Sequence, residues 1–310
     1  TDAEERALTI HDNGIGMSRA EVVANIGTIA KSGSRELMEK LRKGKTAEQV
    51  SELIGQFGVG FYSSFIVADE VTLITRRAGT AVDEAVCWVS DGEGSYTLEA
   101  VEKQSRGTEV VLHLREDEDE FLEAYRLRSI ITKYSDHISL PIEMASMEEG
   151  KEDEFESVND ASALWKCPKR DISDDEYKEF YAHISHDWNP PLEKLHLKLE
   201  GTTEYTALLY IPSQAPFDLF NPESKHGVHL YCKLVFIMDN CEELMPEYFR
   251  FVKGVVDAPD LNLNVSREIL QQDRLVRNIR RNLVKKLFEL LKNMDSEKYE
   301  EFNGIGKNNE

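Results

Sequence analysis

The sequence predicts a mixed α+β protein of about two domains, in which the first sheet is built from antiparallel strands. The chain has 310 residues, which suits about two domains that each bury a core. Several β-prone runs alternate apolar and polar residues, and the turn-forming stretch Asp91-Gly-Glu-Gly94 joins two of them into a hairpin. Ser-x-x-Glu capping boxes at Ser18 and Ser173 open two helical patterns.

The first strand is predicted where Leu8 to Ile10 alternates. Asp12 follows at the strand end, and the turn Gly14-Ile-Gly16 then allows the backbone to bend sharply and to approach a ligand closely. The capping box at Ser18 opens a short helix directly after this turn. A strand, an acid, a glycine turn and a capped helix are a suitable layout for holding a small polar ligand. In isolation, a plain structural turn is the commoner explanation.

A second glycine-rich stretch, Ile54 to Phe65, has three glycines within six residues. A glycine-rich turn that opens a helix presents free amides and the positive end of the helix dipole to an anion. It is not a Walker A motif, because no Gly-Lys-Ser/Thr follows. Taken alone, the stretch is equally well explained as a hinge. The sequence predicts a helix over 35–43 before it, and a buried helix or strand over 62–67.

The remaining elements follow from apolar periodicity. In the first half we expect an antiparallel meander of strands at 70–76, 85–89, 96–101 and 107–114, then a helix over 121–134. In the second half we expect the capped helix from Ser173, strands at 194–199, 204–211 and 228–238, a helix over 246–252, and a long amphipathic helix from 266 or 267 to 292. The charged stretch 147–160 is predicted to link a domain of residues 1–146 to a domain of residues 161–310.

Charge and cysteine content argue against several classes of function. The net charge of −21 opposes binding to nucleic-acid backbones and to anionic lipid. There is no apolar run of membrane length. The four cysteines form no Cys-x-x-Cys pair and have no metal-ligand spacing, so reduced thiols in a cytoplasmic protein are expected. We therefore expect no nucleic acid, no membrane and no metal site on the protein itself.

Several motifs occur in one order along the chain: Asp12-Asn-Gly-Ile-Gly-Met17, Gly27-Thr-Ile-Ala-Lys-Ser-Gly33, Ile54-Gly-Gln-Phe-Gly-Val-Gly-Phe-Tyr-Ser63, Arg106-Gly-Thr108 and Asn264-Val-Ser-Arg-Glu268. Together they strongly resemble the heat-shock protein 90 chaperone family, and the short linker resembles its bacterial members. The resemblance implies that residues 1–146 are the later part of an ATP-binding α/β sandwich of the GHKL type, incomplete at its start. It also implies that residues 161–310 are the first portion of an α/β middle domain.

The resemblance further implies an ATP-dependent chaperone that remodels client proteins and uses ATP with Mg²⁺. Asp12 would accept a hydrogen bond from the adenine amino group, which fits because an ionised carboxylate only accepts. Gly16 and Met17 would line the adenine pocket, and Thr108 would lie beside Asp12. The hydrogen bond between the Asp12 carboxylate and the amino group would be worth about 1.5–3 kcal/mol, or roughly 10- to 150-fold in affinity.

For the phosphate end, the resemblance implies that Asn25 contacts the sugar and phosphates, and that Lys31 and Ser32 belong to the hinge of a lid. Backbone amides of the second glycine stretch would wrap the phosphates; this set is Gly55, Gln56, Phe57, Gly58, Val59, Gly60 and Phe61. Arg267 would reach the γ-phosphate, with Gln271 one helical turn further on. On spacing alone, Arg267 is better explained as a surface residue at a helix start.

Two further hypotheses stay open. The chain could be a polypeptide-binding module without enzymatic activity, for which Trp165 and the stretch 215–220 would supply exposed apolar groups, although ordinary core packing explains them equally well. Related ATPases of the same fold, such as gyrase B, mismatch-repair proteins and sensor histidine kinases, lack the motifs 27–33 and 264–268 in this form. The family's C-terminal dimerisation domain, through which the parent would form a homodimer, is expected to be absent.

The family's general-base glutamate, with a magnesium-binding asparagine four residues later, precedes the strand that carries Asp12, and we expect this chain to lack both. Glu21 and Asn25 share that spacing, but Glu21 is accounted for by the capping box. We therefore predict that this chain alone, incubated with MgATP, releases no phosphate above background in a phosphate-release assay. Turnover at the rate of the intact parent would contradict the missing-base argument.

Overall fold

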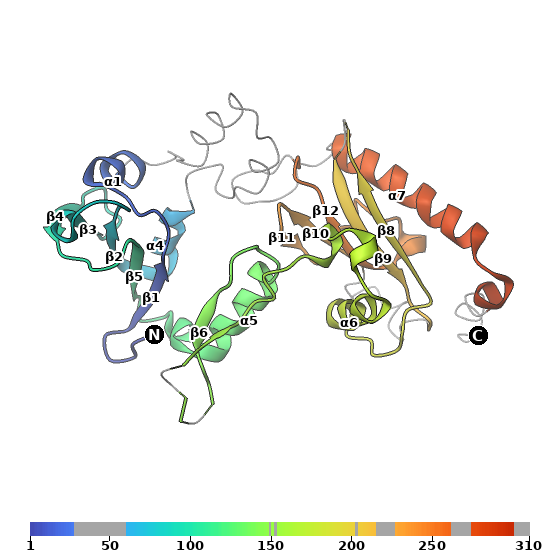
Figure 1. Cartoon of the computed structure of the whole chain (residues 1–310), viewed down its shortest axis with the longest axis horizontal. Coiled ribbons are helices and arrows are strands. Elements are labelled where there is room, and N and C mark those ends of the chain that lie inside the picture. Colours follow the sequence, from blue (N-terminus) through green and yellow to red (C-terminus); the bar gives the residue numbers. More distant parts are fainter. Residues whose placement is uncertain are drawn as a thin grey trace. The chain divides into compact units, whose positions relative to one another are not determined.

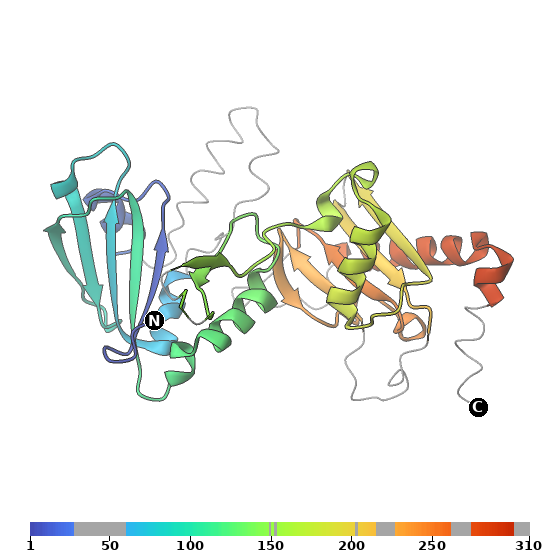
Figure 2. The ribbon, with the colours of Figure 1, turned by 60° about the horizontal axis from the view of Figure 1, so that its bottom comes forward.

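The computed structural model describes residues 1–27, 60–148, 150–151, 154–201, 204–214, 227–261 and 274–300. The chain divides into two units, Thr1–Ile130 and Ile131–Glu310 (Figures 1 and 2), and each is considered by itself. The division falls ahead of the charged stretch 147–160. Part of that stretch is a strand, β7 (Phe155–Ser157), which pairs antiparallel with β6 (Glu143–Ala145). The predicted helix over 35–43 lies outside the described residues.

The first unit contains a five-stranded sheet with the order β1-β5-β2-β3-β4, in which every neighbouring pair is antiparallel (Figure 2). The strands are β1 (Ala7–Asp12), β2 (Ala68–Arg76), β3 (Ala85–Ser90), β4 (Thr97–Val101) and β5 (Gly107–Leu114). The predicted strands and the hairpin between β3 and β4 are confirmed. The simple meander is wrong, because β5 returns to lie between β1 and β2. The mostly exposed β4 suits the edge of the sheet better than β5, which has buried positions along its length.

Helices cover one face of this sheet. They are α1 (Arg19–Asn25), the 3₁₀ turn η1 (Phe61–Ser63) and α4 (Ser64–Val67). Val22 of α1 packs with Leu73, Trp88 and Leu112 of the strands in one apolar cluster. The stretch 62–67 is helical. The prediction that it is buried is wrong, because Ile66 is 67 % exposed. After β5 come η3 (Asp119–Leu122) and α5 (Ala124–Ser135), with η2 (Val82–Glu84) preceding β3.

The second unit has a five-stranded sheet with the order β11-β10-β12-β9-β8, in which only the β10–β12 pair is parallel among the described strands. Its strands are β8 (Glu193–Leu199), β9 (Tyr205–Ile211), β10 (Val228–Cys232), β11 (Val235–Met238) and β12 (Lys253–Asp257). The helix α6 (Asp174–Ser185) packs on one face and α7 (Arg274–Asn293) packs on the other (Figure 1).

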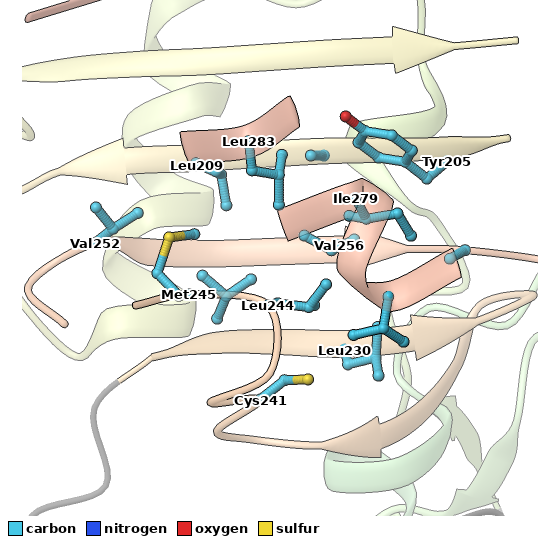
Figure 3. Packing of buried hydrophobic residues seen from close by; sticks show 14 of the residues in the cluster. Tyr205, Leu209, Leu230, Cys241, Leu244, Met245, Val252, Val256, Ile279 and Leu283 are labelled. Atoms are coloured by element: carbon cyan, nitrogen blue, oxygen red, sulfur yellow. The ribbon is translucent and has the colours of Figure 1, made fainter. Parts of the chain in front are cut away.

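Helices cover both faces of this second sheet, which explains why its central strands are largely apolar. Every residue of β9 is buried, which gives a continuous apolar run rather than an alternating one. Figure 3 shows Ile279 and Leu283 of α7 lying over Leu209 and Val256 of the sheet. The capping box at Ser173 is confirmed at the start of α6. The predicted start of the last helix, at 266 or 267, lies outside the described residues.

Two predictions for the second unit are wrong. The expected single strand over 228–238 is a hairpin, β10–β11, because Lys233 and Leu234 both adopt left-handed backbone, with φ of 55° and 65°. The expected helix over 246–252 shrinks to η6 (Glu247–Phe249), and the unpredicted strand β12 follows. For Trp165 the sequence leaves exposure and core packing equally open, and the structure shows core packing: Trp165 is only 1 % exposed and lies in η4 (Leu164–Lys166), which η5 (Lys169–Asp171) follows.

One buried carboxylate, that of Asp257 at the end of β12, binds both the turn of the hairpin and the Trp165 side chain. Its Oδ1 accepts a hydrogen bond from the backbone N–H of Lys233 at 3.0 Å. Its Oδ2 accepts from the Trp165 indole at 3.3 Å and faces the Lys166 ammonium at 3.0 Å. The side chain of Asp257 is fully buried. The turn residues Lys233 and Leu234 are therefore held in an unfavourable backbone conformation by a contact from a strand distant in sequence.

We predict that Asp257→Ala lowers the free energy of unfolding by about 3 kcal/mol or more, because three hydrogen-bonded groups lose a charged acceptor at once. Urea unfolding followed by tryptophan fluorescence measures the change. The matched control is Asp260→Ala, three residues further on and exposed, which should stay within about 0.5 kcal/mol of the parent. Equal effects of the two substitutions would disprove the anchoring role of Asp257.

Candidate functional site

The side chain of Asp12 lies at the end of β1, directly opposite Thr108 of β5. Asp12 Oδ1 accepts two backbone hydrogen bonds, from the N–H of Gly14 at 2.8 Å and from that of Thr108 at 3.2 Å. Asp12 Oδ2 accepts no hydrogen bond from any described residue, and the residue is exposed. The two amides thus fix the carboxylate and leave one of its oxygens open to a donor from outside.

Two close backbone approaches place this carboxylate. Gly16 has a φ of +64°, and a Cβ added to it would lie 2.0 Å from the carbonyl oxygen of Arg76. Gly107 has a φ of +107°, and a Cβ added to it would lie 2.0 Å from the carbonyl oxygen of Asp12. Both positions require glycine on grounds of conformation and of space. The glycine turn after β1 can therefore lie directly against the ends of β2 and β5.

Hydrogen bonds to the neighbouring strands and loops hold the glycine turn at Asn13, Ile15 and Met17. They run from Ala78 N to Ile15 O at 2.7 Å, from Met17 N to Thr75 Oγ1 at 2.9 Å, and from Arg106 Nε to Asn13 O at 3.2 Å. A turn that is held at three of its residues is preorganised, because little of its backbone has to be ordered when a ligand binds.

The capping box of α1 continues this arrangement. Ser18 N and Ser18 Oγ both donate to Glu21 Oε2 at 2.9 Å, and Ser18 Oγ accepts from the N–H of Glu21 at 3.4 Å. The Arg77 guanidinium pairs with the other Glu21 oxygen. The backbone N–H of Ser18 is the main cause that holds the pKa of Glu21 below its usual value, against the opposing effect of burial. Glu21 is thus an occupied, ionised cap, as the sequence predicts, and not an available base.

The described part of the second glycine stretch reaches the other end of α1. The Tyr62 hydroxyl donates to the carbonyl oxygen of Ile26, and the Phe61 ring meets Trp88 edge-on at 5.5 Å. Gly60 and Phe61 therefore begin an element that packs beside the end of α1, where Asn25 lies half-buried. The other predicted site residues lie outside the described residues; they are Lys31, Ser32, Gly55, Gln56, Phe57, Gly58, Val59, Arg267 and Gln271.

Thr75 is a contact residue that the sequence analysis did not single out. It is completely buried and touches both Met17 and Thr108. A signal was present, since Val71, Leu73 and Thr75 alternate along β2 and the first two are core residues. A hydroxyl at the third inward-facing position of such a row must find polar partners inside the protein.

The described residues offer few other candidate sites. They contain no group of three or more His, Cys, Asp or Glu side chains that could hold a metal ion. Cys87, Cys167, Cys232 and Cys241 are not paired in disulfides. In the same described ranges, no helix is long and apolar enough to cross a membrane. The turn after β1 is therefore the best-supported site.

Two family models match the sequence of this chain. Residues 1–118 match the family model described as histidine kinase-, DNA gyrase B-, and HSP90-like ATPase. Residues 147–308 match the family model described as Hsp90 protein. The chain belongs to the Hsp90 family.

Curated relatives named chaperone protein HtpG are similar over nearly the whole chain. The protein from Photorhabdus laumondii is 55% identical over 310 residues, and that from Nitrosomonas eutropha is 56% identical over 317 residues. Each alignment covers 97% of this chain and 49% of the relative. The protein from Nitrosospira multiformis is 56% identical over 299 residues, with 94% of this chain and 46% of the relative covered. The chain therefore spans about half the length of the curated relatives it matches.

We predict that Gly16→Ala destabilises the first unit more than Gly79→Ala does. Both glycines have positive φ, so each substitution costs about 1–2 kcal/mol for the left-handed conformation. Only Gly16 would also push a Cβ into a carbonyl, which adds about 1–3 kcal/mol, since nothing lies within 4 Å of a Cβ at Gly79. Thermal unfolding of the two variants measures the difference. Indistinguishable midpoints would show that the turn does not need the close approach.

Proposed function

We propose that this chain supplies the adenine-binding wall of the nucleotide site in an ATP-dependent chaperone that binds and remodels client proteins. The carrying observation is the Asp12 carboxylate, which two backbone amides orient while its second oxygen has no partner in the described part of the chain. An ionised carboxylate only accepts hydrogen bonds and the adenine amino group only donates them, so the two are complementary. Membership of the Hsp90 family supports the chaperone activity.

At the adenine end, the residues have distinct roles in this proposal. Asp12 Oδ2 accepts from the amino group, and the Thr108 side chain lies beside it. Gly16 and Met17 line the pocket, with the Met17 amide already bound to Thr75. The left-handed turn at Gly16 leaves no side chain between the backbone and the base.

At the phosphate end, we propose that Asn25 contacts the sugar and phosphates, that Lys31 and Ser32 belong to a lid hinge, and that the backbone of 55–61 wraps the phosphates. Arg267 and Gln271 would contact the γ-phosphate. In Arg267, a fixed positive charge would stabilise the charge that develops during phosphoryl transfer. Magnesium would accompany the phosphates; the described residues contain no group of three or more His, Cys, Asp or Glu side chains that could hold it.

We further propose that residues 1–146 act as the later part of the ATP-binding domain and residues 161–310 as the first portion of the middle domain, with 147–160 as linker. The matches at 1–118 and 147–308 support assigning the two halves to different modules. The same proposal extends to the intact protein, which would bind unfolded or partly folded client proteins, form a homodimer and act in the cytoplasm.

Asp12→Asn should weaken ATP and ADP binding by the intact protein at least about 10-fold, because an amide in place of the carboxylate weakens the bond to the amino group. Isothermal calorimetry measures the affinity, and the unfolding midpoint should change little because Asp12 is exposed. The matched control is Asp83→Asn, which removes the same charge from an exposed residue of η2 and should leave affinity unchanged. Unaltered affinity in Asp12→Asn would refute the assignment.

A further inference from the structure

Three polar side chains form a row across the first sheet. Asp12 of β1 pairs with Thr108 of β5, and Thr108 pairs in turn with Thr75 of β2. Residues directly opposite each other on antiparallel strands have their side chains on the same face. Exposure falls along the row: Asp12 is exposed, Thr108 is 9 % exposed and Thr75 is 0 % exposed. The row therefore runs from the open end of the site into the interior.

The Thr75 hydroxyl has three polar neighbours. Its Oγ1 lies 2.9 Å from the backbone nitrogen of Met17, 3.2 Å from the carbonyl oxygen of Gly107 and 3.1 Å from Thr108 Oγ1. A hydroxyl has one proton to donate and two lone pairs that accept. Three neighbours therefore use its whole capacity, and each must take a definite role.

The chemistry of the neighbours fixes those roles. The Met17 N–H can only donate, so it takes one lone pair of Thr75. The Gly107 carbonyl can only accept, so it takes the Thr75 proton. One lone pair remains for Thr108, which must then be the donor in the contact between the two hydroxyls. This is the one assignment in which all three contacts are hydrogen bonds, and buried polar groups are as a rule satisfied.

We propose that Thr75 is a positioning residue that turns the Thr108 hydroxyl into a hydrogen-bond acceptor toward the ligand. With its proton directed at Thr75, Thr108 presents only lone pairs to the site, as the Asp12 carboxylate does. These two side chains then present acceptors alone and select a base edge that donates, such as the amino group of adenine. A base with a carbonyl in that place, such as hypoxanthine, faces repulsion from both residues. This inference rests on the proposed function.

Thr75→Val in the intact protein tests the inference, since valine keeps the shape and removes the hydroxyl. The Thr108 hydroxyl is then free to rotate and to donate to a carbonyl. The readout is the ratio of the dissociation constants for inosine diphosphate and ADP, measured by calorimetry. We expect this ratio to fall about 3- to 10-fold, because the contact between the Thr108 hydroxyl and the carbonyl of the base changes from repulsive to neutral or favourable. Thr75→Ser retains the hydroxyl and should restore the ratio.

The ratio separates positioning from a general structural role. Loss of the hydrogen bond to Met17 weakens the binding of both nucleotides by the same factor, and this factor cancels in the ratio. In a Thr108→Val background, Thr75→Val should leave the ratio unchanged, because Thr75 acts through Thr108. Should Thr75→Val not fold, Thr75→Cys, with a thiol that is a weak donor and acceptor, should lower the ratio in the same direction.

Two results would overturn the inference, and they are distinguishable. Nucleotide binding with an unchanged ratio in Thr75→Val, or in Thr75→Cys where only that variant folds, would refute the role of Thr75 and leave the proposed function intact. No nucleotide binding by the unsubstituted intact protein would overturn the proposed function, and this inference with it.

Discussion

The candidate site depends on two places where one backbone segment lies closer to another than a Cβ would allow. Gly16 lies against the carbonyl of Arg76, and Gly107 lies against the carbonyl of Asp12. The second contact brings the start of β5 to the end of β1, so that the Thr108 amide can reach the Asp12 carboxylate. The first lets the turn after β1 lie along the end of β2, where Thr75 binds the Met17 amide. Without these approaches, the three strand ends could not form one wall.

Features with local causes could be predicted from the sequence. The capping boxes at Ser18 and Ser173 involve residues three apart, and both form. Alternation within a run predicts β5 with its observed bounds, and the turn at 91–94 predicts the hairpin of β3 and β4. Asp12 could be singled out for the same reason, since a strand end, an acid and a glycine turn are adjacent in sequence. The mixed α+β content followed from these elements.

Features with distant causes could not be predicted in this way. Lys233 and Leu234 carry none of the usual signals of a left-handed turn, and Asp257, distant in sequence, holds them there. The same carboxylate accepts a hydrogen bond from the buried Trp165 indole. The place of β5 between β1 and β2 also depends on strands far apart along the chain. The alternation along β2 predicts that Thr75 faces inward, but it does not predict the three partners of the Thr75 hydroxyl, because a threonine in a strand is ordinary.

Comparing two carboxylates shows why one is structural and the other is available for binding. Both oxygens of Asp257 have protein partners, and the residue is completely buried, so a ligand cannot reach it. Asp12 is held as firmly at one oxygen, by two amides, yet its other oxygen has no partner among the described residues. A fixed orientation combined with a free acceptor is what a specific donor requires. The distribution of hydrogen bonds over the two oxygens, together with exposure, therefore supports the proposal that Asp12 binds the ligand.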